Sequence, residues 1–444
     1  MRIQLPKDVD YIIKELQKHG YEAYAVGGCV RDVILGREPE DWDITTSASP
    51  QQVKEIFRRT IDTGILHGTV TVMFDKNGYE VTTYRIDGEY EDNRHPKEVT
   101  YTPYLSEDLM RRDFTINAMA YNEESGMVDI FEGLMDLENR CIRCVGSAEK
   151  RFDEDALRIL RAVRFSAQLG FTIEEETLMA VRKMAGHLRN ISAERIRTEL
   201  NKLLLSPNPD RLLSAYELGI TKIVLSEFDR VMDTKKTTYL GEEPLGNYAL
   251  RCLKILENTA AVWSTDNDES SSVYLSKEKE HLVIAWSILL HGLAANEAKE
   301  VLKRLKFDNE TIDYVYRMIT WYNYEFILTP YGMRKAVSNI GKDLMDMLFC
   351  MRKILIQGEE DSLDCEKGEG LKQAQSLYED ILKRNECVEL KNLVVNGKDL
   401  IELGIKPGKN MGLVLKELLE AVLREPSLNN KESLKNLAVE IILP

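Results

Sequence analysis

A change in pattern near residue 147 is the feature of this sequence that most limits how the chain can fold. Before it, residues 22–26, 44–46 and 67–74 have the composition of short strands, and Asn77-Gly78 predicts a hairpin turn ahead of another strand at 79–85. After it, apolar periodicity predicts helices at 155–169, 173–186, 193–205 and 209–217. We therefore expect an α+β fold, in which a head with a mixed sheet and helices precedes an all-helical remainder.

The charge balance disfavours one broad class of function. The 444 residues include 59 Lys and Arg against 74 Asp and Glu, a net charge of -15. A general nucleic-acid coat protein needs clustered positive charge, although a local basic groove on an acidic body stays compatible with this sum. The chain has no apolar run of about 18 residues and no evident secretory leader, and its seven cysteines are scattered, so we expect a cytoplasmic protein with reduced thiols.

The densest chemical motif is a glycine pair followed by two closely spaced aspartates. Gly27 and Gly28 stand between a predicted strand and a predicted helix, where backbone N–H groups can approach a phosphate and Arg31 can add a positive charge. Asp41 and Asp43 would point to one side of a strand, and converging carboxylates suit Mg²⁺. Each half alone also fits an ordinary turn. Together they indicate metal-assisted phosphoryl transfer.

These residues resemble the signature of a known enzyme family. Segment 27–32 with Asp41-Trp-Asp43, then segments 111–118, 151–165 and 191–200, are similar in kind and order to motifs of the class II tRNA nucleotidyltransferase and bacterial poly(A) polymerase family, in the DNA polymerase β superfamily. Segment 397–408 extends the resemblance. It implies a polymerase-β-like nucleotidyltransferase head at 1–146, a helical neck for base recognition at 147–207, a helical body with a degenerate HD-like region at 208–330 and a helical tail for tRNA binding at 331–444.

The resemblance also implies roles for individual residues. Asp41 and Asp43 would be the catalytic residues and would hold two Mg²⁺ ions. Glu80 is either a third acidic group near the metals or an ordinary exposed strand residue. The residues that the resemblance assigns to nucleotide binding are Gly28, Arg31, Arg112, Asp155, Arg158, Arg161 and Arg164, together with Gly27 and with Asp113, whose carboxylate would accept from a ribose hydroxyl.

The donor and acceptor groups of Asp155 and Arg158 could select a base directly. Three residues apart on a helix, they would be neighbours. A carboxylate only accepts and a guanidinium only donates, so the pair matches the amino donor and ring-nitrogen acceptor of cytosine and adenine and opposes uracil and guanine. The alternative is an internal salt bridge. Arg161 and Arg164 continue the spacing, with a neck salt bridge or a surface position as their alternative.

Two other patterns suggest chemistry that we do not expect. Cys141 and Cys144 have CxxC spacing, but without a second pair they are better explained as reduced structural thiols. Segment 281–292 resembles the place where some relatives carry a His-Asp metal phosphohydrolase module. Here Gly292 follows His291 where that module has aspartate, so we expect no phosphohydrolase activity.

Segment 391–412 is locally basic in an acidic chain, with four lysines against two acidic residues. Lys398, Lys406 and Lys409 are therefore candidates for contacts with tRNA phosphates. The alternative is a helical cap with solvated lysines.

The resemblance implies template-independent addition of C, C and A to a tRNA that lacks its 3′ CCA end, from CTP and ATP, with release of diphosphate. An A-adding partner of a separate CC-adding enzyme and a poly(A) polymerase are alternatives, and the acidic charge argues against the latter. Segment 85–101 has the length expected of an enzyme that adds A. A non-enzymatic RNA-binding scaffold is disfavoured because both aspartates are present. No membrane partner is expected, and a homodimer is left open.

Overall fold

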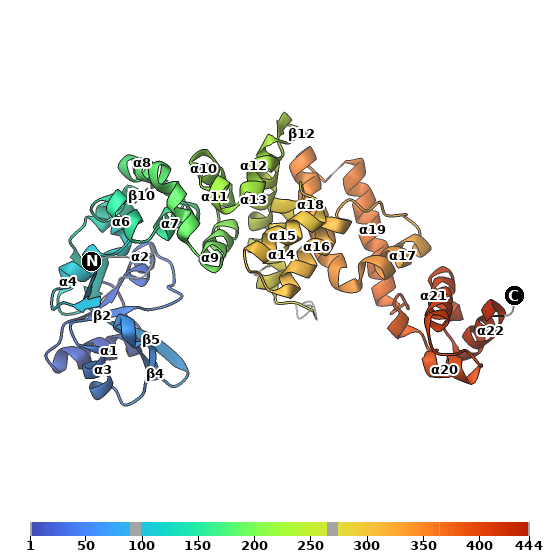
Figure 1. The fold of residues 1–444 in the computed structure, drawn as a ribbon, viewed down its shortest axis with the longest axis horizontal. Helices are drawn as coiled ribbons and strands as arrows, with labels where there is room; N and C mark the ends of the chain where they lie inside the picture. The colour runs from blue at the N-terminus through green and yellow to red at the C-terminus, as the bar shows by residue number, and fades with distance from the viewer. Residues whose placement is uncertain (1, 89–98, 264–273, 364, 443–444) are drawn as a thin grey trace. The chain divides into compact units, whose positions relative to one another are not determined.

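A computed structural model describes residues 2–88, 99–263, 274–363 and 365–442 (Figure 1). The chain forms two compact units, Met1–Asp229 and Arg230–Pro444. Most of segment 85–101, whose length bears on A addition, lies outside the described residues.

The first unit begins with a mixed sheet of seven strands in the order β3-β4-β5-β2-β1-β8-β9. Strands β2 and β5 run parallel, whereas the other neighbours run antiparallel. The predicted mixed sheet is thereby confirmed. Its strands are β1 (Ala23–Val26), β2 (Ile44–Thr46), β3 (Thr60–Gly64), β4 (Thr69–Phe74), β5 (Asn77–Thr83), β8 (Met119–Asn122) and β9 (Gly126–Asp129).

Helices lie before, between and after these strands along the chain, and the first of them shows why they form. Helix α1 (Lys7–Lys18) buries Val9, Ile12, Ile13 and Leu16, which recur every three or four residues and so share one face. Burying each such side chain contributes roughly 1.5–3 kcal/mol. The other elements of the head outside the seven-stranded sheet are α2 (Gly28–Ile34), α3 (Pro50–Ile56), η1 (Ile65–His67), β6 (Arg85–Asp87), β7 (Val99–Tyr101), α4 (Leu105–Met110), η2 (Thr115–Asn117) and α5 (Gly133–Glu138).

The β4–β5 hairpin differs from the prediction at its turn. Phe74 pairs with Asn77, so the connecting residues are Asp75 and Lys76, and Asp75 takes a positive φ of 51°. Gly78 lies inside β5, where a Cβ would meet Cγ2 of Thr71 at 2.8 Å. The prediction of a turn at Asn77-Gly78 was wrong because the chain turns at Asp75-Lys76; Gly78 is required instead by close packing across the strands.

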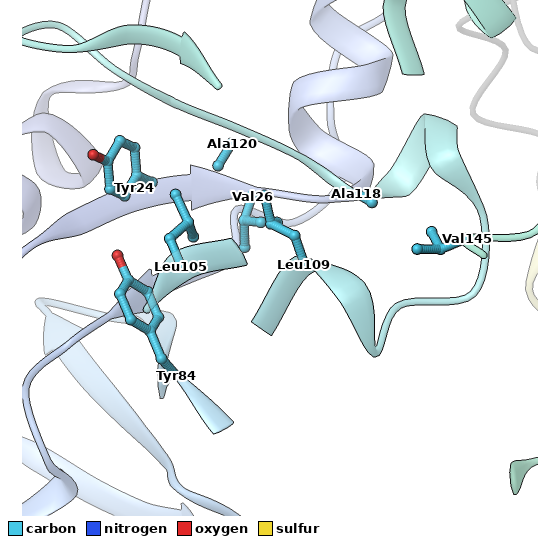
Figure 2. Close-up of a cluster of buried hydrophobic side chains, with 8 residues drawn as sticks. All are labelled: Tyr24, Val26, Tyr84, Leu105, Leu109, Ala118, Ala120 and Val145. Carbon is cyan, nitrogen blue, oxygen red and sulfur yellow. The ribbon is translucent and has the colours of Figure 1, made fainter. Parts of the chain in front are cut away.

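A hydrophobic cluster fixes the end of β1 that carries the glycine pair (Figure 2). Strand β1 pairs with β8, with Val26 opposite Ala120, and the cluster packs both strands against α4. Val26 directly precedes Gly27, so this packing sets where the following backbone begins. The buried members are Tyr24, Val26, Tyr84, Leu105, Leu109, Ala118, Ala120 and Val145.

The rest of the first unit is mostly helical, as predicted, with two differences. The helix expected from residue 155 begins at Leu157, because Asp155 has an extended backbone (φ −143°, ψ 101°). A short parallel pair, β10 (Cys141–Ile142) with β11 (Thr172–Ile173), was not predicted. The helices are α6 (Ala148–Glu154), α7 (Leu157–Leu169), α8 (Glu175–Met184), η3 (Ala185–Asn190), α9 (Ala193–Leu204), η4 (Pro209–Arg211), α10 (Leu212–Glu217) and α11 (Thr221–Val224).

The second unit begins at Arg230, within α12 (Ser226–Asp233), and it is also mostly helical. Helix α18 packs against α13, α14, α16, α17 and α19. A hairpin of β12 (Lys235–Thr238) and β13 (Gly241–Pro244) means that the expected all-helical remainder was not strictly correct. The helices are α13 (Leu245–Trp263), α14 (Lys277–Leu290), α15 (Ala295–Arg304), α16 (Asn309–Trp321), α17 (Pro330–Ile340), α18 (Lys342–Glu360), α19 (Glu366–Lys383), η5 (Leu390–Asn392), α20 (Gly397–Glu402), α21 (Lys409–Arg424), η6 (Pro426–Leu428) and α22 (Lys431–Ile442). Among the described residues, no helix combines the length and apolar character needed to cross a bilayer.

Candidate active site

Three carboxylates gather at the edge of the sheet where β1 ends. Asp41 and Asp43 lie in extended chain directly before β2 rather than inside a strand. The amide of Val26 donates to the carbonyl oxygen of Asp43 (3.0 Å), so the β1–β2 pairing continues through this residue. The parallel register of β2 and β5 brings Glu80 beside Asp43. The edge therefore carries the two predicted catalytic aspartates and the third acidic group.

The electrostatics of this edge favour a cation. Loss of solvent around Asp43 raises the pKa of its carboxyl, Arg112 opposes that shift, and the charge of Asp41 adds to it. The pKa of Glu80 is raised by partial desolvation and then by the charges of Asp43 and Asp41. In the described ranges no three His, Cys, Asp or Glu side chains are close enough to ligate one ion together. Mg²⁺, however, is commonly held by one or two carboxylates plus phosphate oxygens, and this edge fits that pattern.

Gly27 occupies the predicted place between β1 and α2, and its backbone requires glycine. Its φ of 83° and ψ of −129° form a conformation that side chains rarely allow. A Cβ at this position would also lie 2.9 Å from Nη1 of Arg112. Gly28 is the first residue of α2. The glycine pair therefore lets the chain turn while Arg112 approaches its backbone.

Arg112 is a cation of this edge that has a donor without a partner among the described residues. Its Nη2 lies 3.4 Å from Oδ2 of Asp108, a buried α4 carboxylate that also accepts two hydrogen bonds from Arg111. Its Nε is buried and has no hydrogen-bond partner among the described residues. Since a buried guanidinium N–H without a partner is costly, a ligand oxygen would relieve it. Arg112 thus lies beside Gly27 and Asp43 and has one N–H donor without a partner among the described residues.

Arg31 and Asp113 belong to a buried network instead of an open surface. The guanidinium of Arg31 donates to Oδ1 of Asn117 (2.6 Å) and to both carboxylate oxygens of Asp32 (2.9 and 2.8 Å). Asn117 in turn donates to Oδ1 of Asp113 (3.1 Å), and Arg161 donates to Oδ2 through Nε (2.8 Å) and Nη2 (2.5 Å). Burial would raise the pKa of Asp113, but the charge and hydrogen bonds of Arg161 hold it well below its ordinary value. The network joins α2 and η2 to α7.

Arg164 continues this network toward α9. Its Nε donates to Oε2 of Glu199 (2.5 Å) and its Nη1 to Oε1 of Gln168 (2.5 Å), and the side chain is buried. The guanidinium also lies 3.7 Å from the centre of the Phe165 ring, which Arg31 approaches to 5.1 Å. The neck salt bridge that was the alternative for Arg164 is therefore present.

Asp155 and Arg158 are not paired with each other as helix neighbours. Asp155 lies in the break between α6 and α7, where its Oδ1 accepts from the Leu157 amide (3.1 Å). Both of its oxygens accept from Arg195 of α9 (3.2 and 2.7 Å). Arg158 donates to Glu154 (2.8 Å) and to the carbonyl oxygens of Arg151 and Arg111 (3.0 and 2.8 Å). The expectation of a shared helix face was wrong, because Asp155 is outside the helix and each partner is held by another charge.

Four supporting residues were not assigned from the sequence: Asn117, Glu154, Arg195 and Glu199. All four lie within segments 111–118, 151–165 and 191–200, which carry the family resemblance. The sequence contains a signal for Glu154, because it lies four residues before Arg158 and opposite charges at this spacing pair on a helix. No local signal linked Arg195 to Asp155, since these residues are 40 positions apart.

The second unit holds the HD-like position and the tail lysines. His291 is buried, with Nδ1 2.6 Å from the Ile288 carbonyl oxygen, and burial lowers its pKa. A Cβ at Gly292 would lie 2.5 Å from Cδ2 of Leu245, so aspartate would not fit there without a shift. The tail lysines Lys398, Lys406 and Lys409 are exposed around α20 and the start of α21.

Cys141 and Cys144 are free thiols, as expected, and burial raises the pKa of Cys144 to about 12.

Protein-family models match three successive parts of the chain. Residues 23–143 match the Poly A polymerase head domain. Residues 170–232 match a model described as "Probable RNA and SrmB- binding site of polymerase A". Residues 276–438 match domain 2 of tRNA nucleotidyltransferases.

Known proteins match the chain over nearly its whole length. It is 35% identical over 431 residues to a CCA-adding enzyme of Pediococcus pentosaceus, covering 97% of this chain and 96% of that protein. It is 37% identical over 428 residues to a CCA-adding enzyme of Lactiplantibacillus plantarum, covering 96% and 94%. The chain belongs to the CCA-adding enzyme family. The resemblance inferred from the motifs is thus confirmed, and with it the nucleotidyltransferase class.

A solved structure supports the CCA-adding enzyme fold for this chain. The crystal structure of the Bacillus stearothermophilus CCA-adding enzyme in complex with CTP superposes with a TM-score of 0.73 at 31% identity, covering 99% of this chain and 98% of that one. A Thermotoga maritima CCA-adding enzyme complexed with tRNA has the same fold, with a TM-score of 0.61 at 21% identity over 99% and 100% of the two chains. CCA-adding nucleotidyltransferases generally use a divalent metal ion.

Proposed function

We propose that this protein adds C, C and A to the 3′ end of tRNAs that lack CCA, using CTP and ATP and releasing diphosphate. The observation that carries the proposal is the acidic edge formed by Asp41 and Asp43 beside Gly27 and the unsatisfied Nε of Arg112. A carboxylate pair next to a phosphate-binding cation is the arrangement that nucleotidyl transfer requires.

Asp41 and Asp43 would hold two Mg²⁺ ions, with Glu80 contributing negative charge close by. The chemistry supplied by bound Mg²⁺ is activation of the tRNA 3′-hydroxyl and neutralisation of charge on the triphosphate. Arg112 would bind the triphosphate, because its Nη1 approaches Gly27 and its Nε has no partner among the described residues. Gly28 leaves room for the phosphates at the start of α2.

Asp113, Arg31 and Arg164 would act through other residues. The carboxylate of Asp113 already accepts four hydrogen bonds, from Phe114, Asn117 and twice from Arg161. That uses its acceptor capacity, so we assign Asp113 to orienting Arg161 in place of the ribose contact expected from the sequence. Arg31 and Arg164 have carboxylate partners of their own and would stiffen the same network. Arg161, which is half-buried, remains a nucleotide contact in this proposal.

Asp155 and Arg158 would select the base, although not as a pair on one helix face. Arg195 holds both carboxylate oxygens of Asp155, and Glu154 holds Nη1 of Arg158. Preformed partners of this kind reduce the freedom of a recognition group before the ligand arrives. Each group keeps further hydrogen-bonding capacity for a base edge, because a carboxylate has about four acceptor sites and a guanidinium has five donors.

The proposed division of labour keeps the four parts expected from the sequence. Residues 1–146 would catalyse transfer, 147–207 would read the base, 208–330 would form the body and 331–444 would bind tRNA. The first family-model match, at 23–143, ends close to the proposed head boundary, whereas the matches at 170–232 and 276–438 each extend across a proposed boundary. An enzyme acting on newly made tRNA would work in the cytoplasm.

The function is tested with four tRNA transcripts that end before CCA, at C, at CC and at CCA. Each is incubated with one labelled nucleotide at a time. We expect CTP to extend the first two, ATP to extend the CC transcript once, and the complete transcript to stay unchanged. An A-adding enzyme would extend the CC transcript alone, and a poly(A) polymerase would add many residues without regard to the end.

Replacing Lys398, Lys406 and Lys409 with alanine should weaken tRNA binding, if these exposed lysines neutralise phosphates. The slope of log affinity against log salt should fall by about 0.7–0.9 for each phosphate that is no longer neutralised. A filter-binding series across salt concentrations measures both quantities.

The matched control removes three neighbouring lysines that already have acidic partners. Lys391 pairs with Glu389, Lys431 with Asp399 and Lys435 with Glu402. Their replacement changes the net charge equally, so an equal reduction of the slope in the control would argue against a specific tRNA surface. Unchanged affinity in the first variant would mean that its lysines are merely solvated.

A further inference from the structure

A polar hollow in the first unit carries two arginines, and among the described residues no acidic side chain lines it or pairs with them. It has a volume of about 460 Å³ and is lined by residues that follow α2 and α5, end α7 and precede η4. Arg37 and Arg140 supply the charge, and Asn139, Gln168 and Thr172 supply polar groups. None of its described lining residues is aspartate or glutamate. On a chain with a net charge of -15, such a place favours an anion.

The two arginines differ from those of the candidate active site in their partners. Nη1 of Arg37 donates to the carbonyl oxygen of Gln168 (3.3 Å), and the guanidinium of Arg140 lies 5.8 Å from the ring centre of Phe171. Within the described ranges, neither forms an ion pair with a carboxylate, whereas Arg31 and Arg161 do. Both side chains are exposed. Their N–H groups are therefore available for a charge-assisted contact with an anion.

The backbone around the hollow is held in place. Arg140 has a positive φ of 54°, and its carbonyl oxygen accepts from the amide of Thr172 (3.0 Å). The side-chain amide of Asn208 donates to the carbonyl oxygen of Ala167 (2.8 Å), which ties the end of α7 to the segment before η4. A non-glycine residue at positive φ costs on the order of 1 kcal/mol, so surrounding contacts must stabilise the backbone conformation of Arg140.

Two helices connect the hollow with the candidate active site. Helix α2 starts at Gly28, and Arg37 follows its end. Helix α7 starts beside Asp155 and Arg158, and Gln168 near its other end lines the hollow. At 1.5 Å per residue, Arg158 and Gln168 are about 15 Å apart along the axis. A nucleic-acid strand spans that distance in about five nucleotides.

We propose that Arg37 and Arg140 bind a backbone phosphate of the tRNA acceptor stem, a few nucleotides from the 3′ end that is being extended. This proposal rests on the proposed function. A planar guanidinium suits a phosphate because it can donate two parallel hydrogen bonds. A free nucleotide is a poorer fit, since the described lining residues include no aromatic ring on which a base could stack. The contact would position the RNA without reading its sequence.

The test compares Arg37→Gln, Arg140→Gln and the double variant with the wild-type full chain. Affinity for a tRNA without CCA is measured by filter binding over a salt series, with no nucleotide present. We expect roughly five- to ten-fold weaker binding for each arginine at about 0.1 M salt, and a slope reduced by about 1 for each phosphate left without its arginine. The KM for CTP and kcat at saturating tRNA should stay at wild-type values, because neither arginine lies at the acidic edge.

Arg58→Gln is the matched control, because Arg58 is an exposed arginine before β3 that does not line the hollow. Unchanged affinity and slope in the double variant would overturn the proposal. An equal weakening in Arg58→Gln would overturn it as well, since the effect would then reflect net charge. Because binding is measured without nucleotide, a wild-type protein that binds tRNA and fails to extend it would refute the proposed function while still testing the hollow.

Discussion

Asp41→Asn and Asp43→Asn should each stop nucleotide addition while leaving tRNA bound. Asparagine keeps the size of the side chain and removes the negative charge at the sheet edge. Metal-dependent charge stabilisation is worth several kcal/mol, so kcat should fall by roughly a thousand-fold or more, and equally for CTP and ATP. Rates are measured on transcripts ending at C and at CC, and tRNA affinity by filter binding.

A second readout separates loss of metal from loss of fold. Mn²⁺ binding, followed by its electron paramagnetic resonance signal, should weaken in both variants at an unchanged melting temperature. Asp62→Asn is the matched control, because Asp62 is an exposed β3 carboxylate paired with Lys54 (2.9 Å) away from the edge. Near-normal turnover in either Asp41→Asn or Asp43→Asn would show that the assignment of the acidic edge is wrong.

Asp155→Ala and Arg158→Ala should relax the choice of nucleotide. Without Asp155, the amino group of C or A loses its acceptor and the repulsion against the carbonyl group of U or G is removed. Without Arg158, the donor to the ring nitrogen is absent. We expect discrimination against UTP and GTP to fall roughly ten- to a hundred-fold per removed partner, together with slower correct addition. The ratios of kcat/KM for the four nucleotides measure this.

The alternative for these residues is a purely structural role, and the geometry supplies a matched control. Arg158 is buried and donates to one carboxylate and two carbonyl oxygens. Arg334 in the second unit is also buried and donates to Glu386 and to the carbonyl oxygens of Leu423 and Arg424. Both alanine variants should lower the melting temperature. If Arg158→Ala lowers the melting temperature but leaves the kcat/KM ratios for the four nucleotides unchanged, Arg158 does not read the base.

Arg195→Leu extends this experiment to the support behind Asp155. The substitution removes both hydrogen bonds to the Asp155 carboxylate and leaves that group in place. A residue that only positions Asp155 should change discrimination less than Asp155→Ala does. It should have no further effect when combined with Asp155→Ala, because the two side chains act as one unit.

Much of the head was open to prediction because its signals are local. Strands β1 and β2 follow from short apolar and β-branched runs, and the bend after Val26 follows from Gly27, which alone tolerates the required backbone. Asp41 and Asp43 sit two residues apart, so any extended chain brings them to one side. The β12–β13 hairpin escaped prediction because its strands, KKTT and GEEP, have no apolar alternation.

The base-reading region was predicted only in part. A helical pattern runs through residues 155–169, so the sequence suggests one continuous helix. The chain breaks at Asp155 because its carboxylate accepts from the Leu157 amide and from Arg195, which together stabilise an extended backbone there. Arg195 is distant in sequence, and propensity within a short window cannot register it.

The sequence by itself determined the family, the α+β class, the place of the glycine pair and the identity of the paired carboxylates, because each depends on residue types at short, fixed spacings. The tertiary structure alone decided which charges meet. Asp155 pairs with Arg195, Asp113 with Arg161 and Arg164 with Glu199, across 35 to 48 positions of chain. Ion pairing depends on distance in space and on burial, and neither is encoded by spacing along the chain.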